Sequence, residues 1–164
     1  MPEDYLPDFC RQPTLILGCG NFLFGDDGFG PAVVKYLEEH YPIPQGVYVL
    51  DAGTGIQDIL CTIALSSQRP KRLVLVDAMD RGAEPGEVTA ATLDEHRPAR
   101  RAQFSLHGWP TLDLLKDLSD SCGIEVGLVL VQPEPLPPEV QPGLSARVQT
   151  AVKKACEHIK GKYL

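Results

Sequence analysis

Acidic residues stand at the ends of three predicted strands, where they could take part in metal or acid–base chemistry. A glycine-rich turn after the first strand carries Asp26 and Asp27, and Asp51 and Asp77 end the second and third strands. His107 stands at the start of a later helix. Because ligands bind at the carboxyl ends of the strands in an open parallel sheet, we expect these side chains to converge at one edge, on surface loops.

Three of these residues form the strongest candidate site. Asp27, Asp77 and His107 would offer two hard oxygen ligands and one imidazole, which suits a borderline divalent ion such as Zn²⁺ or Ni²⁺ with an open coordination position. Asp51 opens a tight Asp-Ala-Gly-Thr-Gly turn and is expected to shape the site. Cys19 lies close enough to add a soft ligand, although a buried thiol that packs as a small hydrophobe is the commoner case.

The same residues also have purely structural interpretations. Either Asp26 or Asp27 would serve to cap a helix N-terminus, and a strand-end aspartate such as Asp77 can cap the following turn. His107 by itself could equally be a hydrogen-bonded or exposed histidine. A nucleotide site is disfavoured, because Leu23 stands where a dinucleotide fingerprint needs its third glycine and the two aspartates would repel a pyrophosphate.

The hydrophobic pattern predicts the sheet that would bring these residues together. Strands are predicted over residues 14–19, 47–51, 72–77, 87–92 and 126–131, and helices over 30–40, 56–65, 111–118 and 144–159. Strands that are apolar on both faces indicate a mostly parallel sheet covered on both sides. The alternating pattern of 87–92 favours an antiparallel edge strand. We therefore predict an α/β three-layer sandwich with a mostly parallel five-stranded sheet and helices on both faces.

Length, charge and cysteine usage narrow the class of protein further. The 164 residues are predicted to form a single domain, 1–164, in which the first thirteen residues form an arm and residues 132–142 a rigid surface loop. A net charge of −7 argues against binding to nucleic acid or to an anionic membrane surface. No apolar stretch approaches the roughly 20 residues that span a bilayer. Five widely spaced cysteines and an acidic N-terminus indicate reduced thiols and a cytoplasmic location.

Several blocks of this sequence resemble the hydrogenase maturation proteases of nickel–iron hydrogenases. They are Gly18-Cys-Gly-Asn-Phe-Leu-Phe-Gly-Asp-Asp-Gly-Phe-Gly30, Asp51-Ala-Gly-Thr54, Val74-Leu-Val-Asp-Ala78, Ser105-Leu-His-Gly108, and Val131-Gln-Pro-Glu134 with Gly143-Leu-Ser145. The blocks keep the order and spacing of the family over nearly the whole chain, and the long first block is the most specific. That block is most similar to the branch that serves deazaflavin-coenzyme-reducing hydrogenases of methanogenic archaea.

The resemblance implies a nickel-dependent endopeptidase. Its partner would be the precursor of the nickel–iron hydrogenase large subunit, from which it removes a C-terminal extension after metal insertion. By position, Asp27, Asp77 and His107 match the family's metal-binding residues. The nickel is implied to come with the substrate, and zinc or cadmium to substitute for it in vitro.

The resemblance also assigns catalysis to Asp27 and Asp77. No serine or cysteine nucleophile is expected, so water would attack, activated by a carboxylate or by the metal, with Asp27 as the favoured residue for that role. A non-hydrolytic nickel-sensing docking protein or metallochaperone for the same large subunit would need the same three metal-binding residues and stays the alternative. The oligomeric state is left open.

Overall fold

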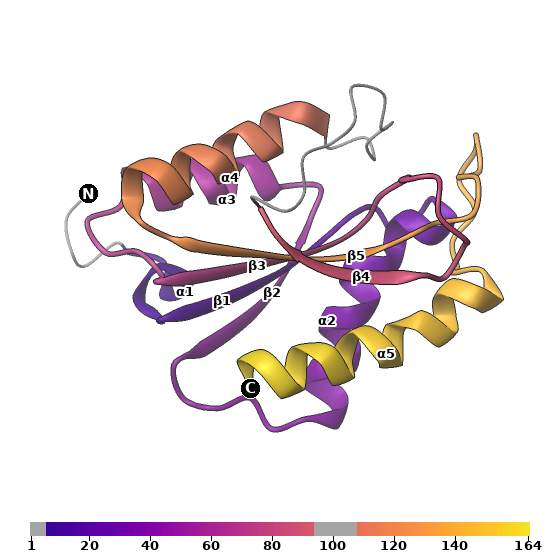
Figure 1. Cartoon of the computed structure of the whole chain (residues 1–164), viewed down its shortest axis with the longest axis horizontal. Coiled ribbons are helices and arrows are strands. Elements are labelled where there is room, and N and C mark those ends of the chain that lie inside the picture. Colours follow the sequence, from indigo (N-terminus) through magenta and orange to yellow (C-terminus); the bar gives the residue numbers. More distant parts are fainter. Residues whose placement is uncertain (1–5, 94–107) are drawn as a thin grey trace.

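A five-stranded sheet runs through the middle of the molecule, with helices on both of its faces (Figure 1). The computed structural model describes residues 6–93 and 108–164. The strands are β1 (Thr14–Cys19), β2 (Val47–Gly53), β3 (Arg72–Ala78), β4 (Val88–Thr92) and β5 (Glu125–Val131), in the spatial order β2-β1-β3-β5-β4. All neighbouring strands are parallel except β4, which pairs antiparallel with β5 at the edge.

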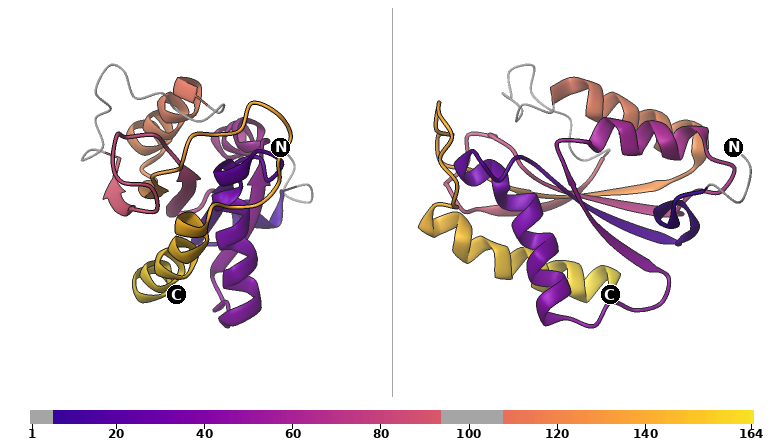
Figure 2. Two further views of the ribbon diagram at one scale, coloured as in Figure 1. Left: turned by 90° about the vertical axis from the view of Figure 1, so that its right-hand side faces the viewer. Right: turned by 180° about the vertical axis from the view of Figure 1, so that it is seen from behind.

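Four long helices form the two outer layers. They are α2 (Phe29–His40), α3 (Ile56–Leu65), α4 (Gly108–Cys122) and α5 (Ala146–Tyr163), and two short elements, α1 (Asp8–Arg11) and the 3₁₀ helix η2 (Gly25–Gly28), complete the described structure. Figures 1 and 2 show α3 and α4 on one face of the sheet and α2 and α5 on the other. The predicted fold class is confirmed. No helix within residues 6–93 and 108–164 is long and apolar enough to cross a membrane.

The buried strands explain why the sheet is covered on both faces. Successive side chains of a strand point to opposite faces, so Leu15 and Leu17 of β1 pack in the cluster under α3 and α4, whereas Ile16 packs in the cluster under α2 and α5. All six residues of β1 are buried. Such a strand cannot alternate apolar and polar residues, which is why it reads as a continuous apolar run.

Several segments differ from their predicted form; α4 and α5, for example, end at Cys122 and Tyr163, four residues beyond their predicted ends. The predicted N-terminal arm contains α1, and its Cys10 is buried in the core, with Sγ 3.4 Å from Ser66 Oγ. Helix α4 begins at Gly108, three residues before the predicted start at Thr111, and so includes Pro110. Because the first turn of a helix has no intrahelical use for its N–H groups, proline is accepted there.

Helix α2 begins in very close contact with strands β1 and β3. A Cβ atom built on Gly30 would lie 2.2 Å from Cys19 O, 2.3 Å from Cys19 N and 2.6 Å from Val76 O. Gly30 has no positive φ angle, and neither has Gly28. Glycine is therefore required at position 30 because two backbone segments approach each other closely there, and not because a tight turn demands a positive φ angle.

Candidate active site

Three of the predicted acidic residues surround one buried thiol at the carboxyl end of the sheet. Burial raises the pKa of Cys19 well above its ordinary value, and the negative charges of Asp77, Asp51 and Asp27 raise it further. These carboxylates come from β3, from β2 and from η2, three separate segments of the chain. The structure thus brings Asp27, Asp51 and Asp77 to one edge of the sheet.

The raised pKa of Cys19 keeps its thiol protonated near neutral pH. Its side chain is 1% exposed, and Sγ lies 4.0 Å from the carbonyl oxygen of Leu17, to which it donates. Since the thiolate is the nucleophilic form of cysteine, this residue is not the attacking group of a hydrolytic reaction. Cys19 packs in the core as a small hydrophobe, as the commoner interpretation of a strand-end thiol expects.

Asp27 is held inside the turn that connects β1 to α2. Gly20 has a φ angle of 130°, and Gly25 starts η2 with a φ angle of 55°. The Asp27 side chain is fully buried, and its Oδ2 accepts a hydrogen bond of 2.9 Å from the backbone N–H of Asn21. Two glycines in the left-handed region therefore allow the chain to fold back over this carboxylate.

Asp77 is also buried, and it lies within a strand. It is the penultimate residue of β3, is 6% exposed, and accepts a 2.8 Å hydrogen bond from the N–H of Ala78 at Oδ1. The expectation that Asp27 and Asp77 lie on surface loops is wrong. The loops that follow β1 and β3 fold over the strand ends and enclose both carboxylates.

Asp51 is the exposed member of the group. Its Oδ1 accepts a 2.9 Å hydrogen bond from the N–H of Gly53 and so fixes the backbone at the end of β2. The carbonyl of Gly53 in turn accepts a 3.0 Å hydrogen bond from the N–H of Gly20, which joins this end of β2 to the loop that carries Asp27. These contacts shape the two loops beside the buried acids, and the supporting role of Asp51 in the site stays a prediction.

Asp26 does not join the other acidic residues. Its Oδ1 accepts a 2.7 Å hydrogen bond from the N–H of Ser145, and its Oδ2 accepts 2.9 Å hydrogen bonds from the N–H of Glu134 and from Ser145 Oγ. The expectation that Asp26 converges with Asp27 is wrong. Consecutive residues of a 3₁₀ helix are rotated by about 120°, so two adjacent side chains cannot face the same way.

The capping interpretation of the two aspartates is also wrong for the helices nearest to them. The N-cap residues of η2 and α2 are Phe24 and Gly28, and neither makes a side-chain cap hydrogen bond. Asp26 instead holds both ends of the proline-rich segment 134–145, which we call the proline loop. Pro137 of this loop packs against Gly25, so the loop lies directly on the acidic turn.

Removing the Asp26 carboxylate should destabilise the protein strongly. We expect Asp26→Ala to lower the free energy of unfolding by about 3 kcal/mol, because it leaves three donors around a buried position without their charged acceptor. Chemical denaturation followed by circular dichroism measures this change. Glu139→Ala, an exposed acidic residue on the same loop, should stay within about 0.5 kcal/mol of the wild type. Equal stability of the two variants would contradict the role of Asp26.

The third predicted metal ligand, His107, lies outside the described residues. Within residues 6–93 and 108–164, no group of three or more histidine, cysteine or acidic side chains is arranged to hold a metal ion. The described part of the predicted ligand set is thus the carboxylate pair of Asp27 and Asp77. The metal-binding and catalytic roles of these three residues stay predictions.

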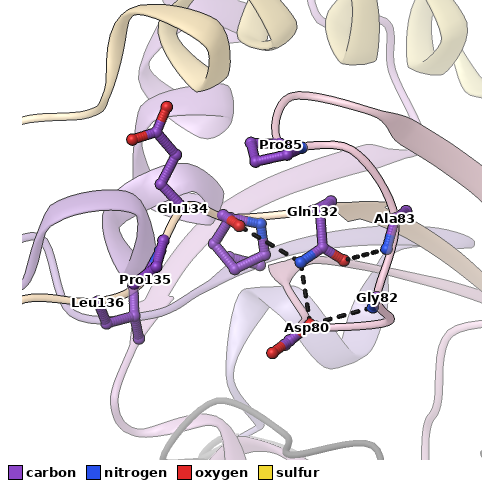
Figure 3. A pocket seen from close by; sticks show the side chains of 10 residues that line it. Asp80, Gly82, Ala83, Pro85, Gln132, Glu134, Pro135 and Leu136 are labelled. Atoms are coloured by element: carbon purple, nitrogen blue, oxygen red, sulfur yellow. Dashed lines mark hydrogen bonds between the residues drawn. The ribbon is translucent and has the colours of Figure 1, made fainter.

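A cavity that the sequence did not indicate lies beside this site. Its volume is about 540 Å³, and it is bounded by the loop between β3 and β4 and by the start of the proline loop (Figure 3). The residues that line it are Ala78, Asp80, Gly82, Ala83, Pro85, Gln132, Pro133, Glu134, Pro135 and Leu136. One wall of the cavity is formed by residues of the motif Val131-Gln-Pro-Glu134. The residue types of this motif did not by themselves indicate a binding role.

Gln132 organises the wall of the cavity (Figure 3). Its Oε1 accepts hydrogen bonds from the N–H of Arg81 at 2.7 Å and of Ala83 at 3.2 Å, and its Nε2 donates to Asp80 Oδ1 at 3.0 Å. The hydrogen bond from Gln132, together with one from the N–H of Gly82, lowers the pKa of the Asp80 carboxyl. The Asp80 side chain therefore carries its negative charge at neutral pH and keeps it when the pH falls well below neutral.

Comparison of the whole fold with solved structures defines a class of protein. The hydrogenase-maturating endopeptidase HybD from Escherichia coli superimposes with a TM-score of 0.71 over 90% of each chain, at 27% identity. A hydrogenase 3 maturation protease superimposes with a TM-score of 0.72, at 27% identity, over 93% of this chain and 92% of that one. The chain thus has the fold of a maturating endopeptidase.

Sequence comparison identifies the family. Residues 31–162 match the family model described as hydrogenase maturation protease. A Methanocaldococcus jannaschii protein that provisionally bears the same name is 40% identical over 153 residues, which cover 93% of this chain and 97% of the relative. The coenzyme F420 hydrogenase subunit delta of Methanothermobacter thermautotrophicus is 35% identical over 88% of this chain and 90% of its own length. The chain belongs to the hydrogenase maturation protease family, and it is a protease.

Proposed function

We propose that this protease removes a C-terminal extension from the precursor of a nickel–iron hydrogenase large subunit after nickel has been inserted. The observation that supports this most directly is the pair of buried carboxylates, Asp27 and Asp77, at the carboxyl end of the sheet in a member of this family. The relative named as a coenzyme F420 hydrogenase subunit favours a hydrogenase of that class as the source of the precursor.

In the proposed reaction, Asp27 accepts a proton from a water molecule as the water oxygen attacks the scissile carbonyl carbon. The bond between the carbonyl carbon and the amide nitrogen then breaks, and the proton passes to the departing amine. Asp27 suits this task because its carboxylate is enclosed by protein and is oriented by the N–H of Asn21. Asp77 completes the pair from the neighbouring strand end.

Nickel enters this proposal as part of the substrate. Asp27 and Asp77 carry hard oxygen donors, and we propose that they contact the nickel of the precursor together with His107. The nickel would mark the precursor as ready for cleavage and polarise the scissile carbonyl. Zinc or cadmium would substitute for it only in vitro.

The proposal is tested by incubating the protein with nickel-loaded and nickel-free precursor and following the mass of the precursor. We expect a C-terminal peptide to be lost from the loaded precursor only. An unchanged mass accompanied by a stable complex would replace the proposal with a non-hydrolytic docking protein. Cleavage of both precursors at the same rate would contradict the proposed nickel dependence and leave the endopeptidase activity standing.

A further inference from the structure

We propose that the cavity beside the acidic pair is a subsite for a positively charged side chain of the polypeptide substrate, with Asp80 and Glu134 as its anionic partners. The inference rests on the proposed function, since it names what a second part of the same site binds. The volume of the cavity, about 540 Å³, lies within the roughly 300–1,000 Å³ that is usual for ligand-binding pockets.

The cavity lies at the same end of the sheet as the two carboxylates of the candidate site, although neither of them lines it. Ala78, which lines the cavity, directly follows Asp77 and donates its N–H to the Asp77 carboxylate. On the other side, the N–H of Glu134 donates to Asp26, the neighbour of Asp27 in η2. A polypeptide whose scissile bond lies at Asp27 and Asp77 could therefore extend along this end of the sheet and place a nearby side chain in the cavity.

The walls of the cavity are held in place before any substrate arrives. The N–H of Gln132 donates to Glu87 O at 2.9 Å, and the N–H of Gly86 donates to Gln132 O at 2.8 Å, so the two walls are joined through their backbones. The Gln132 side chain adds its own hydrogen bonds to the loop between β3 and β4. A wall with this many internal bonds needs little reorganisation to receive a ligand.

The lining has few hydrogen-bond donors to offer. Pro85, Pro133 and Pro135 have no N–H group. The N–H groups of Gly82 and Ala83 are already used by Asp80 and Gln132. The amide nitrogen of Gln132 is likewise engaged, by Asp80 Oδ1 at 3.0 Å and by Pro133 O at 3.3 Å. A ligand that brings only acceptors, such as a phosphate or a carboxylate, would find little to bind.

The lining is rich in acceptors instead, and it is negatively charged. Asp80 Oδ2 and the carboxylate of Glu134 accept no hydrogen bond, and neither residue forms an ion pair, within the part of the chain that the structure describes. Figure 3 shows the two residues on different sides of Gln132. An arginine, lysine or protonated histidine side chain supplies both the charge and the donors that this lining lacks.

Neutralising the two carboxylates tests the subsite. We expect Asp80→Asn and Glu134→Gln each to lower kcat/KM on nickel-loaded precursor by about tenfold or more. The melting temperature should stay the same for Glu134→Gln and fall only slightly for Asp80→Asn, because the hydrogen bonds to Asp80 favour its charged form. Both changes are conservative: asparagine keeps the oxygen that accepts from Gln132 and Gly82, and Glu134 holds Asp26 through its backbone. Glu84→Gln is the matched control, because Glu84 lies on the same loop but outside the lining. It should cleave at the wild-type rate.

Precursor variants identify the side chain that is bound. Each basic residue that flanks the scissile bond is replaced singly by glutamine. One replacement should reduce cleavage by the wild-type protein and have little further effect on the Asp80→Asn, Glu134→Gln double variant. A charge swap, with Glu134→Lys against a glutamate at that precursor position, should recover part of the rate.

Two outcomes separate this inference from the proposed function. Failure of the wild-type protein to cleave loaded precursor would overturn the proposed function. Normal cleavage of loaded precursor by the double variant, or the absence of any basic precursor residue coupled to it, would overturn the subsite and leave the protease standing.

Discussion

Replacing Gly30 by alanine is expected to destabilise the protein strongly. The new methyl group would lie 2.2–2.6 Å from backbone atoms of Cys19 and Val76, which belong to strands β1 and β3. Backbone atoms of a central sheet cannot move aside as a flexible side chain can. We expect the free energy of unfolding to fall by about 3 kcal/mol or more, at the upper end of the overpacking range. Denaturant midpoints by circular dichroism measure it.

Gly161 provides the control for this substitution. It lies in α5, and an added Cβ would have no neighbour within 4 Å. Gly161→Ala should raise the free energy of unfolding by about 0.5–1 kcal/mol, because alanine loses less conformational entropy in a helix. If the free energy of unfolding of Gly30→Ala were within about 1 kcal/mol of the wild-type value, the close approach of α2 to the sheet would not be the constraint that we describe.

Asp77→Asn is expected to abolish processing while the protein keeps its stability. Asparagine retains the oxygen that accepts from the N–H of Ala78. It removes one negative charge from the group that Asp27 and Asp51 form around Cys19, which relieves repulsion. We expect the melting temperature to stay the same or rise, and the cleavage rate on nickel-loaded precursor to fall by about 100-fold or more. Mass spectrometry of the precursor over time gives the rate.

An aspartate outside the site controls for the change of charge. Asp58 is an exposed residue of α3, and Asp58→Asn should process precursor at the wild-type rate. Wild-type processing by Asp77→Asn would remove this residue from the active site. A loss of activity that came with a large loss of stability would instead assign Asp77 a structural role.

The fold was predictable because its signals are local. A strand buried on both faces must be apolar throughout, so β1 was predicted with its observed ends, 14–19. The alternating segment 87–92 likewise matched the antiparallel edge strand β4, since a strand that is half exposed to solvent alternates apolar and polar residues. The boundary of α4 was less accurate, because Pro110 is acceptable in a first turn but would be excluded from a helix interior.

The sequence by itself therefore determined the α/β sandwich and placed Asp27, Asp51 and Asp77 at one edge, because strand ends follow from hydrophobic runs. Only the tertiary structure decided which way each side chain faces. Asp26 and Asp27 are adjacent in the chain, yet one holds the proline loop and the other lies beside Cys19. The cavity at Gln132 and the backbone contact at Gly30 also depend on segments that are distant in sequence, and no local pattern of residues records such contacts.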